Sequence, residues 1–161
     1  MFAIRNWHQD LLCYGIILGM ICIDVGFDWA AANDQPDAWK AAQLYYKHMS
    51  TPSTITGKFF IPAVVGTLLV TLISRVVRTK AILDVVMSLL FVGGGAYFFV
   101  VIKPAQEFLH DLKLEKAQAM EKLAIIFTGH CVLAATCFIG IVVHAIQNSS
   151  APKSDAVKKS K

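Results

Sequence analysis

The sequence predicts an all-α integral membrane protein, a four-helix bundle with short interfacial helices in the outer connections. Of its 161 residues, 56% are hydrophobic and 16% are charged, whereas ordinary soluble domains are about 45–50% apolar and about 25% charged. The apolar residues gather in four stretches of roughly 17 to 24 residues, and each is long enough to cross a hydrocarbon core of about 30 Å. The basic residues cluster at those ends of the stretches that share one side of a membrane.

Four spans are expected at about 11–27, 59–77, 82–102 and 123–146. They define one transmembrane domain over residues 1–147, followed by a basic tail over 148–161. A polar connection of about thirty residues separates the first two spans, and about twenty residues separate the last two. The second and third spans are joined by a turn at 78–81.

Orientation follows from lysine and arginine, which stay preferentially on the cytoplasmic side near span ends. Arg5 precedes the first span, and Arg75 and Arg78 flank the short turn. The tail holds four further lysines, whereas the two long connections mix both signs of charge. We therefore expect both termini in the cytosol and both long connections outside it. In this interpretation the basic residues orient the protein in the lipid bilayer, so the positive charge does not indicate a nucleic acid partner, and none is expected.

An alternative treats residues 11–23 as the apolar core of a signal peptide that is cleaved after the small run at 30–32. Asp24, Asp28 and Trp29 are poor residues for the approach to such a cleavage site.

The last four residues place Lys158 and Lys159 at the fourth and third positions from the end of the sequence. This resembles the dilysine retrieval signal of endoplasmic reticulum membrane proteins, which works only on a cytosolic tail. Alternatively, the tail lysines are drawn to anionic lipid at about 1 kcal/mol per charge. The first interpretation predicts an endoplasmic reticulum location.

The two outer connections carry amphipathic segments. Residues 37–49 place Trp39, Gln43 and Tyr46 at helical spacing, which predicts a short helix lying along the headgroups. A second amphipathic segment is expected after Pro104, leading into the fourth span. Four aromatic residues suit an interfacial belt, namely Trp29, Trp39, Tyr45 and Tyr46.

Small residues set how closely the spans can pack. Gly15 and Gly19 form a GxxxG pair in the first span, and glycines occupy 93–95 in the third. Packing inside the bundle, a face for a homodimer or a partner membrane protein, and a kink at 93–95 are the alternatives. The four cysteines, expected to be small buried apolar residues, are Cys13, Cys22, Cys131 and Cys137.

Ionisable groups within the spans are candidates for function, because burying one unpaired in hydrocarbon costs at least about 2.5 kcal/mol. Asp24 and Asp28 lie four residues apart, hence on one face of the first span. His130 and Tyr97 reach a similar depth from the fourth and third spans. These four residues, Asp24, Asp28, Tyr97 and His130, form a hypothetical catalytic pocket in which an aspartate orients the imidazole as a general base or proton relay.

The alternative is structural: the carboxylates reach water at the interface, and the histidine donates to a backbone carbonyl. Asp84 is expected to balance its helix dipole beside Arg78 or Lys80. His144 is expected to be solvated at the inner boundary.

No cofactor or metal can be assigned from the sequence. His130 and His144 are fourteen residues apart, about four helical turns, and so lie on nearly the same face. Two haems on that face would need axial partners on another span, and the remaining histidines are expected outside the hydrocarbon. No His, Cys or carboxylate group has the usual spacing of zinc ligands.

Several short segments resemble the anthrone-oxygenase-like family of small four-span membrane proteins. They are Ala42-Gln43-Leu44-Tyr45-Tyr46, Phe59-Phe60-Ile61-Pro62, Ile102-Lys103-Pro104, and His130 near the start of the fourth span. The resemblance implies a four-span fold and chemistry on an apolar small molecule. Ala105, Gln106 and residues 131–133 stand where that family usually carries polar and basic side chains.

Two functions remain open. One is a non-catalytic accessory or scaffold protein that packs against partner membrane proteins through its glycine faces. The other is an oxygenase-like or isomerase-like membrane enzyme, or a carrier, for an apolar small molecule that binds beside Asp24 and His130. The second needs a lipophilic cavity touching both residues, and the first does not.

Overall fold

The computed structural model describes residues 7–33, 35–50, 59–79 and 81–149, and every regular element in these ranges is helical. The elements are α1 (Trp7–Ala32), α2 (Ala38–Ser50), α3 (Ile61–Thr79), α4 (Ile82–Tyr97), η2 (Phe98–Ile102), α5 (Lys103–Phe108) and α6 (Lys116–Ser149). The all-α four-helix prediction is confirmed. Residues 150–161 of the predicted tail, with its lysine pair, lie outside the described residues, whereas Asn148 and Ser149 end α6.

Within the described ranges, four segments are long and apolar enough to cross a membrane: His8–Ala32, Ile61–Arg78, Ile82–Phe108 and Lys116–Gln147. Each contains or largely overlaps a predicted span, and the helices at both ends of the chain are longer than predicted. α6 begins at Lys116 because the amphipathic segment before the fourth span continues directly into it. α1 continues to Ala32 because Asp24 and Asp28 find partners inside the bundle.

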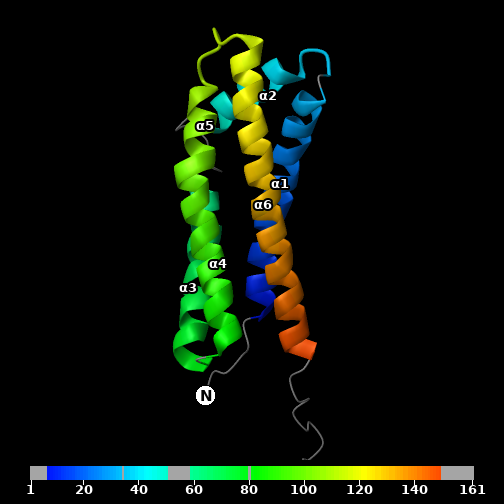
Figure 1. The fold of residues 1–161 in the computed structure, drawn as a ribbon. Helices are drawn as coiled ribbons and strands as arrows, with labels where there is room; N and C mark the ends of the chain where they lie inside the picture. Colours follow the sequence, from blue (N-terminus) through cyan, green and yellow to red (C-terminus); the bar gives the residue numbers. More distant parts are fainter. Residues whose placement is uncertain (1–6, 34, 51–58, 80, 150–161) are drawn as a thin grey trace, which may run out of the picture.

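The four long helices lie side by side along one axis (Figure 1). The start of α1, the end of α3, the start of α4 and the end of α6 lie together at one end, which we call the turn end. α2, α5 and the start of α6 lie at the opposite end, which we call the α2 end. The predicted short helix at 37–49 is confirmed as α2, and it packs against α1, α5 and α6.

α4, η2 and α5 form one helical path with a widened turn near the α2 end. Gly93, Gly94 and Gly95 lie within α4, whose α-helical hydrogen bonding continues through them. The irregular turn is instead η2, where the Lys103 N–H donates to the Phe98 carbonyl. Pro104 follows immediately and has no N–H for the preceding turn, which favours a local widening of the helix.

Two apolar clusters form the core. At the α2 end, side chains from α1, α2, η2, α5 and α6 pack together, namely Ala31, Ala42, Tyr46, Ile102, Ala105, Leu109, Ala119, Leu123 and Ile126. Nearer the turn end, α1, α3, α4 and α6 contribute Cys13, Tyr14, Ile21, Leu68, Leu72, Met87 and Cys137. α1 and α6 contribute to both clusters and make the most extensive contact between two described helices.

The register of α1 against α6 is set by Tyr14 and Gly140. Tyr14 is fully buried, and a Cβ atom added at Gly140 would lie 2.6 Å from the Tyr14 ring. Only glycine therefore lets the two backbones approach with this ring between them.

The cysteines divide into two pairs. Cys13 and Cys137 are buried in the core as predicted, but Cys22 and Cys131 are exposed, and all four are free thiols. The prediction of a buried role is therefore wrong for Cys22 and Cys131, which lie on the outward faces of α1 and α6.

Candidate functional site

Asp28 is the centre of a buried polar network at the α2 end. The Tyr46 hydroxyl donates to Asp28 Oδ1 at 2.6 Å, and His130 Nδ1 lies 2.8 Å from Asp28 Oδ2. The three residues come from α1, α2 and α6, and each is at most 2% exposed. A buried carboxylate is stable in such a place only when it is paired and hydrogen-bonded, as Asp28 is.

Asp24, one turn earlier on α1, joins the same network. The Tyr45 hydroxyl donates to Asp24 Oδ1, and His130 Nε2 lies 3.6 Å from Asp24 Oδ2. The Asp24 side chain is 22% exposed, so Asp24 is the more exposed of the two carboxylates, Asp24 and Asp28. We call Asp24, Asp28, Tyr45, Tyr46 and His130 the Asp28 network.

α2 delivers both phenols because its apolar face is held against the bundle. Ala42 and Tyr46 are buried in the core, and the Tyr45 ring stacks on Phe27 with centroids 4.3 Å apart. Burial and the Asp28 carboxylate raise the pKa of Tyr46 above its ordinary value, and burial and the Asp24 hydrogen bond do the same for the pKa of Tyr45. Both phenols therefore keep their protons and act as donors at neutral pH.

The geometry engages both nitrogens of His130. The Nδ1 atom lies against Asp28 on one side, and the Nε2 atom faces Asp24 on the other. A general base needs a nitrogen within hydrogen-bond reach of substrate, whereas here each nitrogen faces a carboxylate of the protein. The arrangement is that of a polar clamp joining α1, α2 and α6.

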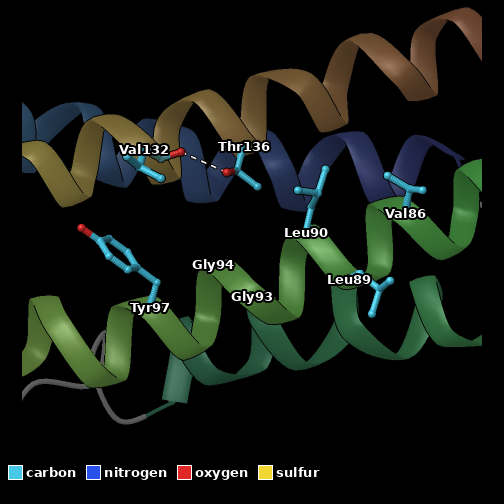
Figure 2. A pocket seen from close by; sticks show the side chains of 8 residues that line it. All are labelled: Val86, Leu89, Leu90, Gly93, Gly94, Tyr97, Val132 and Thr136. Atoms are coloured by element: carbon cyan, nitrogen blue, oxygen red, sulfur yellow. Dashed lines mark hydrogen bonds between the residues drawn. The ribbon is translucent and has the colours of Figure 1, made fainter.

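The structure brings together three of the four predicted pocket residues, Asp24, Asp28 and His130. Tyr97 instead lines a groove of about 470 Å³ between α4 and α6. Figure 2 shows Tyr97 pointing from α4 towards α6, with Gly93 and Gly94 further along α4. The groove is lined by Val86, Leu89, Leu90, Gly93, Gly94, Tyr97, Val132 and Thr136, and therefore by neither Asp24 nor His130.

A second polar network surrounds Arg75 near the turn end. Arg75 Nη1 donates to Asp10 Oδ2 at 2.6 Å and lies 3.1 Å from His144 Nδ1. Arg75 Nη2 donates to Gln147 Oε1 at 2.9 Å and lies 3.4 Å from Asp84 Oδ1. We call these five residues, which come from all four long helices, the Arg75 network. The Arg75 guanidinium, with its several fixed N–H donors, thus links all four long helices.

One sequence expectation fails here: His144 is 1% exposed, so the prediction that it is solvated is wrong. Asp84 lies in the first turn of α4 as predicted, and Lys80, one of its two expected neighbours, lies outside the described residues. Asp84 pairs with Arg75 on α3 rather than with Arg78. The reason is that Arg75 points between the helices, whereas Arg78, almost one turn later, is exposed.

Four network residues were not predicted from the sequence: Asp10, Arg75, Tyr45 and Tyr46. One signal for Asp10 was present: Asp10 and Asp24 are fourteen residues apart in α1, as are His130 and His144 in α6. Equal spacings on two antiparallel helices bring Asp24 to His130 and Asp10 to His144. For Tyr45 and Tyr46 no such signal exists, because an interfacial belt uses the same residue type.

Among the described residues, no three or more His, Cys, Asp or Glu side chains are grouped so that they could hold a metal ion. Comparison with known proteins found no matching family, no similar curated protein and no similar solved structure. The case for function therefore rests on the geometry of this chain.

Replacing Tyr46 by Phe should lower the free energy of unfolding by about 1–3 kcal/mol, because it leaves a buried carboxylate oxygen without its donor. Unfolding by SDS in mixed micelles measures the change. Tyr97→Phe is the matched control, with an expected effect within about 0.5 kcal/mol. Equal losses in the two variants would contradict a specific role for the Asp28 network.

Replacing Arg75 by Gln should cost about 3–5 kcal/mol, because Asp10 and Asp84 lose their buried countercharge. Arg78→Gln removes the same charge from an exposed position on the same helix and should change stability by less than about 0.5 kcal/mol. Thermal unfolding of the purified variants in detergent gives both values. If the Arg75→Gln protein is as stable as the unmodified chain, the guanidinium is not what holds the helices together.

Proposed function

We propose that this chain is a non-catalytic accessory or scaffold protein of the endoplasmic reticulum membrane, which packs against another transmembrane helix through one face of α1. The observation that carries the proposal is a row of small residues on that face, Gly15, Gly19, Cys22 and Gly26, all of them exposed. We call this row the glycine face.

The glycine face is not used inside the bundle. A Cβ atom added at Gly15, Gly19 or Gly26 would meet nothing within 4 Å. α1 turns the opposite side, with Asp10, Tyr14 and Asp28, towards its neighbours. Small residues spaced by three and four positions let two membrane helices approach closely, where van der Waals contact drives association.

The polar networks favour a scaffold over an enzyme. In the Asp28 network, His130 Nδ1 lies 2.8 Å from Asp28, Nε2 faces Asp24 at 3.6 Å, and both phenols donate to the carboxylates. The alternative, an oxygenase-like or isomerase-like enzyme or a carrier for an apolar small molecule, needs a cavity that touches Asp24 and His130. The groove between α4 and α6 is lined by neither.

The glycine face can be tested with the cysteine that lies on it. In the purified chain, oxidation should link Cys22 to Cys22 of a second copy, while Cys131, equally exposed on α6, should not cross-link. If the natural partner is another protein, Cys22 should cross-link to it in native membranes instead. Either product should disappear in Gly19→Leu, because the added side chain separates the helices.

Gly95→Leu is the matched control, since Gly95 is exposed on α4 and also has open space around its Cβ position. Its cross-linking should equal that of the unmodified chain. Absence of any Cys22 product, or a product that Gly19→Leu leaves unchanged, would overturn the proposal.

The location rests on Lys158 and Lys159 together with the distribution of basic residues. With both termini in the cytosol, the lysine pair is accessible to the retrieval machinery. Replacing both lysines by serine should release the full-length protein to later compartments, as read by microscopy of a tag at the amino terminus. Replacing Lys153 alone should have no effect, and retention of the double variant would remove the lysine pair from the mechanism.

A further inference from the structure

Three buried polar atoms near the Arg75 network have no hydrogen-bond partner among the described residues. They are Asp10 Oδ1, the Tyr14 hydroxyl and His144 Nε2. The three residues are at most 1% exposed. Unpaired buried polar groups are uncommon in proteins, and each costs free energy unless water or an ion satisfies it.

The three groups lie along the interface between α1 and α6, with Asp10 and Tyr14 on α1 and His144 on α6. Asp10 and Tyr14 are four residues apart on the same face of α1. Both face His144: its Nε2 lies 3.9 Å from Asp10 Oδ2, and its ring centroid lies 5.5 Å from that of Tyr14. The distance of 3.9 Å is too long for a direct hydrogen bond, so His144 Nε2 and Asp10 Oδ1 both need another partner.

The hydrogen-bond donors and acceptors of Asp10, Tyr14 and His144 are also complementary. Arg75 has no acceptor, so the His144 Nδ1 atom that lies 3.1 Å from Arg75 Nη1 accepts a hydrogen bond. Gln147 Oε1, 3.2 Å from the same Nδ1, accepts from Arg75 Nη2. The proton of neutral His144 is then on Nε2, which donates towards Asp10, while Asp10 Oδ1 only accepts and the Tyr14 hydroxyl can do either.

We propose that Asp10, Tyr14 and His144 form a buried site for one water molecule at the α1–α6 interface. The water accepts from His144 Nε2 and from the Tyr14 hydroxyl, and donates to Asp10 Oδ1. Three partners is the usual number for a buried water. The site extends the Arg75 network to Tyr14 and completes the hydrogen bonding of α1 with α6 near the turn end.

Radiolytic footprinting of the full chain in detergent and H₂¹⁸O tests the site, because hydroxyl radicals formed from a bound water label the side chains around it. Tyr14 and His144 should be labelled with ¹⁸O despite their burial. Tyr46 is the internal control, since it is equally buried but hydrogen-bonded to protein. A Tyr14 rate as low as that of Tyr46 would overturn the proposal.

A variant tests the role of the hydroxyl. Tyr14→Phe removes one of the three partners, so labelling of His144 should fall several-fold, whereas Tyr46→Phe should leave it unchanged. An unchanged His144 signal in Tyr14→Phe would exclude the hydroxyl from the site. Thermal stability that rises with Na⁺ but not with choline would instead assign the site to a monovalent cation and overturn the assignment of water.

Discussion

The antiparallel contact between α1 and α6 is the interaction on which the other features depend. Its centre is the close approach of Tyr14 to Gly140, which fixes the register of the two helices. With that register, Asp24 and Asp28 meet His130 on one side of the contact, and Asp10 approaches His144 on the other. A shift by one helical turn would leave carboxylates unpaired inside a membrane, where their cost is high.

The two polar networks recruit the remaining helices to this pair. The Asp28 network adds α2 through the phenols of Tyr45 and Tyr46. The Arg75 network adds α3 and α4 through Arg75 and Asp84. Lipid is as apolar as the helix surfaces, so hydrophobic burial alone does not specify which helices associate. Directional hydrogen bonds that involve a charged group supply that specificity here.

This arrangement changes the role assigned to the ionisable residues in the spans. In sequence they are candidates for catalysis, since membrane proteins commonly keep such groups for transport or chemistry. In the structure, His130 has a carboxylate at each nitrogen, and Arg75 has acceptors from α1 and α6 and a carboxylate from α4. The outward surface of α1, with its open glycines, is left as the part available to another helix.

The sequence by itself determined the four helical spans, the short helix α2 and the common face of Asp24 and Asp28, because these follow from local periodicity and length. Only the tertiary structure decided the partners. Tyr45 and Tyr46 donate hydrogen bonds to Asp24 and Asp28, Tyr97 lines a separate groove, and His144 is buried. Those outcomes depend on the rotation and register of helices far apart in sequence, and they follow from how Tyr14 meets Gly140.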